Sequence, residues 1–123
     1  MTEERRFTVE EANQLLPQLS KTLEIIQEAH RRILAGAEPW RGQARTNGGG
    51  EQTDEYWQAM KTMRAGLDRL FASGIILRDA ETGLIDFPSQ RDGEEIFLCW
   101  RLGEGQVGFW HGPESGFGGR RPL

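Results

Sequence analysis

A change of hydrophobic period at Ser73-Gly74 divides this chain into two parts. Before this point, apolar residues recur at intervals of three and four; after it, they form short runs separated by glycine-containing turns. The first pattern is typical of packed helices, and the second of strands. The sequence therefore predicts an α+β fold in which helices precede a sheet.

The first helix is predicted over residues 7–35. Thr8 and Glu11 have the spacing of a capping box, in which each side chain bonds to the other residue's backbone N–H. Pro17 lies inside the apolar pattern and removes one backbone hydrogen bond, so we expect the helix to be kinked or broken there. Gly36 is the expected helix end.

A glycine-rich segment separates this helix from the next. Residues 36–52 lack apolar periodicity and contain three consecutive glycines, so we expect a flexible loop. Trp40 in this loop either packs on the helices or contacts a partner. A second helix is predicted over residues 53–73 with the same heptad spacing, which indicates an antiparallel hairpin and, in a homodimer, a four-helix bundle. The two apolar seams contain Leu19, Leu23, Ile26, His30 and Ile33, and Tyr56, Met60, Met63, Leu67 and Leu70.

The remaining sequence predicts a four-stranded antiparallel β-meander over residues 75–111 and an irregular tail over 112–123. The short links between strands, including Asp92-Gly93, join antiparallel neighbours. Pro88 cannot donate to a ladder, so it should mark a strand end or a sheet edge. A chain of 123 residues is too short for two cores, which predicts a single domain over 1–123. The expected strands are Ile75–Asp79, Leu84–Pro88, Glu94–Arg101 and Gln106–His111.

Charge and cysteine content exclude several classes of protein. The net charge is −4, and acidic and basic residues alternate, so a nucleic-acid partner is not expected. Cys99 is the single cysteine and cannot form an internal disulfide, which indicates a reducing compartment. The charged start and the lack of an apolar run of about 20 residues predict no signal peptide and no membrane span. We expect a soluble, cytoplasmic protein.

Several short motifs occur together: Phe7–Pro17, Gly83–Pro88, Leu98–Arg101, Trp110-His111 and Gly119–Leu123. In this combination the chain resembles an uncharacterised bacterial protein family that is catalogued only as a domain of unknown function. The resemblance covers nearly the whole chain apart from the predicted loop. It implies a small bacterial cytosolic protein, and it brings no established activity.

Polar side chains with useful chemistry concentrate at the end of the sheet and in the tail. His111 at a strand end can reach a ligand, or it can simply bond to a backbone carbonyl. With Asp86 and Glu114 it offers one imidazole and two carboxylates, a set that suits zinc, manganese or iron. These three are the predicted metal ligands, although a solvated or arginine-paired Asp86 is the alternative. Arg101 and Arg120, with the tail glycines, could instead hold a carboxylate or phosphate, or the tail could only close the chain.

For two further side chains, both a purely structural role and a chemical role are open. Cys99 lies in the most apolar strand, where a thiol usually behaves as a small buried hydrophobe; as a nucleophile it would need His111 as its base. His30 on the helical seam either finds a partner such as Tyr56 or acts as a ligand or pH switch. The sequence predicts no catalytic residue.

Two functions follow from these features. The first is a non-enzymatic binding or interaction module that self-associates through its helices as a dimer. The alternative is a domain that binds a divalent metal ion or an anionic small molecule between sheet and tail, at Asp86, Arg101, His111, Glu114 and Arg120. The second function leaves open whether the protein is an enzyme.

Overall fold

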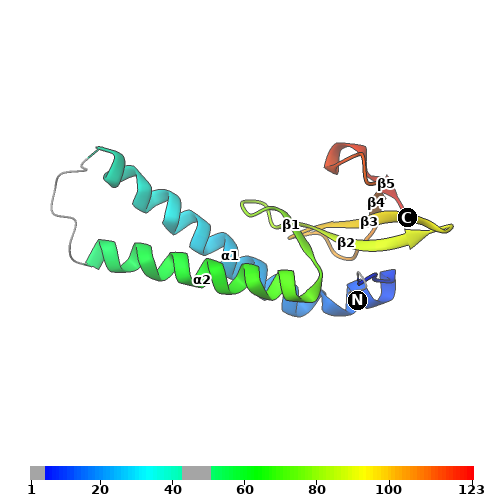
Figure 1. The fold of residues 1–123 in the computed structure, drawn as a ribbon, viewed down its shortest axis with the longest axis horizontal. Coiled ribbons are helices and arrows are strands. Elements are labelled where there is room, and N and C mark those ends of the chain that lie inside the picture. The colour runs from blue at the N-terminus through cyan, green and yellow to red at the C-terminus, as the bar shows by residue number, and fades with distance from the viewer. Residues whose placement is uncertain (1–4, 43–50) are drawn as a thin grey trace.

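The computed structural model describes residues 5–42 and 51–123, and for 37–42 and 51–53 it describes the backbone alone. Helix α1 (Val9–Gly42) and helix α2 (Glu51–Ser73) form an antiparallel hairpin that precedes an antiparallel sheet (Figure 1). The predicted α+β fold is confirmed. The predicted flexible loop over 36–52 is wrong at both ends, because 36–42 and 51–52 are helical. Its central part, 43–50, and the side chain of Trp40 lie outside the described residues.

Helix α1 begins at the predicted capping box and continues further than predicted. Thr8 Oγ1 accepts a hydrogen bond from Glu11 N, and Glu11 Oε1 accepts one from Thr8 N, each at 3.0 Å. The helix passes through Pro17, so a break there is wrong, although Figure 1 shows a bend in the N-terminal part of α1. Gly36 does not end the helix either. A Cβ atom at Gly36 would lie 2.6 Å from Tyr56 Cδ1, so this glycine lets the two helices approach closely.

The seam of α2 contains most of the predicted residues, but Met60 is replaced in it by Ala59, and Gly66 joins it. Ala59 and Leu70 are buried, and a Cβ atom at Gly66 would lie 2.6 Å from Ile26 Cγ1. Met60, predicted to lie in the seam, is instead 39% exposed. Small residues therefore form part of the contact with α1, because they allow the helix axes to approach. A sequence pattern based on large apolar residues does not identify them.

Helix α2 ends as predicted at Ser73-Gly74. Gly74 has a φ of +82°, and Ile75 N donates to the Leu70 carbonyl at 3.0 Å. This is the hydrogen bond of a Schellman cap, in which glycine takes the left-handed position. The chain then turns directly into the sheet.

The sheet has five strands in sequential order, one more than predicted. The tight turn Asp92-Gly93 has positive φ at both residues, which is the geometry of a type I′ hairpin. A short strand in the tail adds the fifth strand, after a 3-10 turn at Phe117–Gly119. The predicted strand from Gln106 begins only at Phe109. The strands are β1 (Ile76–Asp79), β2 (Leu84–Arg91), β3 (Glu94–Arg101), β4 (Phe109–His111) and β5 (Arg121–Pro122).

Pro88 lies within β2, where it pairs with Phe97, so the predicted strand end is wrong. The last residue of β2 that pairs with β1 is Asp86, opposite Ile76, and Pro88 therefore lies beyond the reach of β1. On this edge the Pro88 carbonyl accepts a hydrogen bond from Phe7 N at 2.7 Å. A missing N–H is tolerated there because no neighbouring strand requires it.

The two faces of the sheet have different neighbours. Figure 1 shows the sheet between the N-terminal turns of α1 on one side and the C-terminal tail on the other. The first face packs into the main apolar core together with Phe7 and the apolar residues of α1. The opposite face carries the alternate residues of β2, β3 and β4, and these include the polar side chains considered below. The core residues of the first face are Ile85, Phe87, Ile96, Leu98 and Trp100.

No helix among the described residues is long and apolar enough to cross a membrane.

Candidate metal site

Three neighbouring strands bring Asp86, Cys99 and His111 together on the sheet face that the tail covers. Asp86 of β2 is paired directly with Cys99 of β3, and Cys99 is paired with Phe109 of β4. His111 follows two residues after Phe109 and therefore lies on the same face. The potential ligand atoms of the three residues all lie within 4.8 Å of one another. The residues are 1%, 1% and 3% exposed, so the cluster is almost completely shielded from water.

Asp86 is held by two positively polarised partners. Its Oδ2 accepts a hydrogen bond from Arg78 Nε at 2.7 Å and lies 2.9 Å from His111 Nε2. The Arg78 side chain is 43% exposed, whereas that of His111 is 3% exposed. The buried partner of this carboxylate is therefore the histidine, and the arginine closes the site from the solvent side.

Both ring nitrogens of His111 face acceptors. Nε2 faces the Asp86 carboxylate, and Nδ1 lies 2.8 Å from the carbonyl oxygen of Gly112. Only the imidazolium form can donate to both acceptors at once. The other way to satisfy this geometry is a metal ion on Nε2 with the Nδ1–H donated to the Gly112 carbonyl, which is the usual outer contact of a metal-bound histidine.

Cys99 is held as a thiol in the metal-free site. Burial raises its pKa above the usual range, and the nearby Asp86 charge acts in the same direction, while a contact from Arg120 opposes both. The ring nitrogens of His111 are engaged by Asp86 and Gly112, so the base required for a nucleophilic cysteine is already occupied. The nucleophile alternative therefore has no support in the described part of the chain.

Arg120 fastens the tail over the cluster. Its Nη2 and Nη1 atoms donate to Glu104 Oε2 at 2.6 Å and Oε1 at 3.2 Å, and its Nη1 lies 3.9 Å from Cys99 Sγ. The guanidinium also stacks 3.9 Å from the ring centre of Phe109 and 4.2 Å from that of Phe117. Burial alone would raise the pKa of Glu104, but hydrogen bonds from Arg120 and from the Arg101 backbone outweigh it and lower this pKa.

The structure groups only part of the residues predicted from the sequence. Asp86 and His111 meet, and Arg120 borders the cluster through Cys99 Sγ. Glu114 is exposed, and within the described residues the three-membered group contains Cys99 in its place. Arg101 stacks on the Phe117 ring at 5.2 Å and is not part of this group.

The predicted metal ligands did not include Cys99, although the sequence contains a signal for its position. A two-residue turn at Asp92-Gly93 pairs Arg91 with Glu94, and counting outwards from this pair places Asp86 opposite Cys99. The alternation of side chains along β4 places His111 and Phe109 on one face and Trp110 on the other. Val107 lies before β4 and packs in the main core.

The chain was compared with known proteins at three levels. Residues 5–123 match the family described as an uncharacterized conserved protein, DUF2203. No curated protein and no solved structure gives a significant match.

Proposed function

Because this chain belongs to the DUF2203 family, whose description names no activity, we propose its function from the geometry of the buried site. The domain binds one divalent transition-metal ion through Asp86, Cys99 and His111. The observation that carries this proposal is the convergence of a carboxylate, a thiol and an imidazole within 4.8 Å on a buried sheet face.

The donor set favours a zinc-like ion over calcium or magnesium. Thiolate and imidazole ligands are typical of zinc and other late first-row metals, whereas calcium and magnesium take oxygen ligands. The Asp86 carboxylate and the Cys99 thiolate together would balance the charge of a divalent ion. Arg78 and the Gly112 carbonyl would hold Asp86 and His111 in orientation, as outer partners of metal ligands commonly do.

Burial favours a structural or sensory role for the metal. Each ligand residue is at most 3% exposed, and the tail covers the site. Three protein ligands leave a fourth tetrahedral position, as in hydrolytic metal centres, but here that position would be shielded from bulk water and substrate by the buried surroundings. A non-enzymatic protein is therefore the form of this proposal that the described residues support best. An anion-binding role is less favoured, because the guanidinium of Arg120 is already paired with Glu104.

Cobalt(II) titration tests the proposal. Chelator-treated protein should bind one cobalt ion and develop the near-ultraviolet absorption of a thiolate–cobalt bond, and zinc should displace it. Cys99→Ser should lose this absorption, and His111→Gln should weaken binding. Glu114→Gln is the matched control, because Glu114 is exposed and outside the group, and it should bind as the parent does. If the parent binds no metal, or if Cys99→Ser leaves the cobalt spectrum unchanged, the proposal is wrong.

The same reasoning extends to location. The single cysteine is a free, buried thiol that is suited to a reducing compartment, which supports a cytoplasmic protein. The resemblance of its motifs supports a bacterial source. Self-association through the helices is a second candidate property, and the exposed apolar residues of α2 favour it.

A further inference from the structure

Helix α2 carries a second apolar stripe beside its seam, and three of its large side chains are exposed although Leu67 packs partly against the core. Trp57, Met60, Leu67 and Phe71, with Arg64 between them, repeat at intervals of three and four. This α2 stripe lies one position along from the seam that packs on α1. Phe71 is 84% exposed, Trp57 54% and Met60 39%. Large apolar side chains at heptad spacing on an exposed helix face indicate a helical partner.

A hollow of about 980 Å³ lies where the α2 stripe meets the sheet. Phe71 belongs to both the stripe and the hollow, so the two adjoin. The lining of the hollow is mainly apolar; it also includes Arg5 and the mutually paired Arg6 and Glu95. Figure 1 shows that the hairpin projects well beyond the sheet, which leaves the opposite end of the stripe uncovered. The other apolar residues that line the hollow include Ala72, Ile75, Ile76 and Phe97.

The charges on the α2 stripe complement each other in an antiparallel pair. Arg64 and Asp68 approach to only 3.9 Å within one chain, and their side chains are 83% and 72% exposed. Suppose that two opposite charges lie one turn apart on the same side of a helix. When two copies of this helix pair antiparallel, the charges form two complementary contacts between the copies. We propose that the α2 stripe pairs antiparallel with the same stripe of a second copy of this chain, with Arg64 of each copy opposite Asp68 of the other.

This register also fills the hollow. When Arg64 lies opposite Asp68 of the second copy, Met60 lies opposite Ala72, and Trp57 reaches the level of Ile75. Trp57 is then about 13 Å from the two-fold axis, at the rise of 1.5 Å per helical residue. The half-exposed tryptophan of each copy thus reaches the apolar hollow of the other, and both ends of the interface are equivalent.

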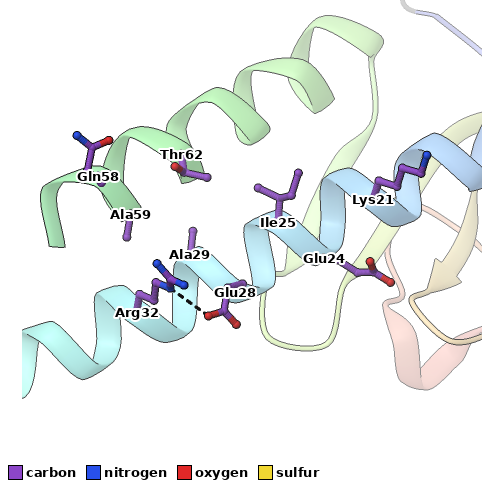
Figure 2. Close-up of a pocket in the computed structure, with 9 residues that line it drawn as sticks. All are labelled: Lys21, Glu24, Ile25, Glu28, Ala29, Arg32, Gln58, Ala59 and Thr62. Carbon is purple, nitrogen blue, oxygen red and sulfur yellow. Dashed lines mark hydrogen bonds and ion pairs between the residues drawn. The ribbon is translucent and has the colours of Figure 1, made fainter. Parts of the chain in front are cut away.

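The other open face of the hairpin is a poorer interface and serves as the control. Figure 2 shows a groove of about 520 Å³ between α1 and α2, with Ile25 and Ala29 directed toward α2. Charged residues line its rim, and Glu28 is already paired with Arg32 at 3.1 Å. A partner helix there would have to displace or bury these charges.

Sedimentation equilibrium in the presence of a chelator tests the dimer independently of the metal proposal. The parent chain should be a dimer at micromolar concentration. Phe71→Glu should make it monomeric, and its helical circular dichroism should stay unchanged, because Phe71 is 84% exposed. Ile25→Glu, on the groove face, should leave the dimer intact. A monomeric parent at high micromolar concentration, or dissociation by Ile25→Glu and not by Phe71→Glu, would overturn the proposal.

Charge reversal tests the register. Arg64→Asp and Asp68→Arg should each weaken the dimer by about tenfold or more, because each places like charges opposite one another. An equal mixture of these two variants should dimerise again, since every Asp then faces an Arg. If the mixture stays monomeric while each variant is folded, the antiparallel register is wrong.

Discussion

We predict that the two members of the buried pair Asp86 and His111 contribute unequally to the stability of the fold. In metal-free protein, His111→Leu should destabilise the fold more than Asp86→Leu does. The first change leaves a carboxylate that is 1% exposed with Arg78 as its remaining charged partner. The second leaves a histidine whose Nδ1 still has the Gly112 carbonyl as its hydrogen-bond partner.

The magnitudes follow from these partners. Removing the buried hydrogen-bond partner of a carboxylate costs up to about 3 kcal/mol, and we expect about this loss for His111→Leu, with Arg78 still bound to Asp86. Asp86→Leu leaves one ring nitrogen unsatisfied, which costs about 1–2 kcal/mol. Arg78 can then turn to water, because its side chain is 43% exposed. The double variant should lose far less than the sum of the two single losses, because it leaves neither polar group without its partner.

Urea unfolding of the three variants with chelator present measures these values. For a domain of this size, the loss from His111→Leu corresponds to a fall in Tm of about 10 °C. Gln90→Leu is a control for leucine on an exposed position of β2, and it should change stability by less than about 0.5 kcal/mol. The reasoning fails if Asp86→Leu costs as much as His111→Leu, or if the two losses simply add.

Three other outcomes are expected. Metal binding should release about one proton from Cys99, whose thiol pKa is raised by burial, and calorimetry in buffers of different ionisation enthalpy would measure this release. The pKa of Glu104 is lower in the folded than in the unfolded protein, so the ionised carboxylate stabilises the fold above its unfolded pKa. This stabilisation is lost as the pH falls through the folded pKa. In urea unfolding, Glu104→Gln should therefore make the stability less dependent on pH below about pH 4. Gly83→Ala should cost at least about 1 kcal/mol more than Gly93→Ala by thermal unfolding. Both glycines have positive φ, but only at Gly83 does a Cβ atom clash, 2.7 Å from a neighbouring side-chain carbon; equal losses would contradict this.

Local signals in the sequence predicted the local structure. The capping box at Thr8, the stop at Gly74 and the hairpin at Asp92-Gly93 each depend on residues close in sequence, and each is present in the structure. The small residues of the α2 seam were not predicted, because Gly66 contributes to helix contact by its lack of a side chain. Hydrophobicity alone cannot report that kind of packing.

The site was only partly predictable because it depends on two strand pairings, and only one of them has its register set by a tight turn. The β2–β3 register follows from a tight turn, and it places Asp86 opposite Cys99. The β3–β4 register follows an irregular connection over 102–108, so nothing local fixes where His111 falls. Glu114 was preferred to Cys99 because a carboxylate in a polar tail looks like a ligand, whereas a cysteine in an apolar strand looks like core.

The polar cluster costs the fold more than apolar residues would. Burying a carboxylate and a histidine requires desolvation, and apolar replacements of buried ion pairs are often neutral or stabilising. The surrounding rings of Phe97 and Phe109 and the tail with Phe117 could enclose an apolar patch equally well. Stability therefore does not explain why Asp86, Cys99 and His111 occupy this face. A site that binds a metal ion does explain it, since a metal requires these donor atoms and a covering tail retains the ion. If the Asp86→Leu/His111→Leu double variant proves nearly as stable as the parent, the fold does not need the pair, and the argument for a ligand becomes stronger.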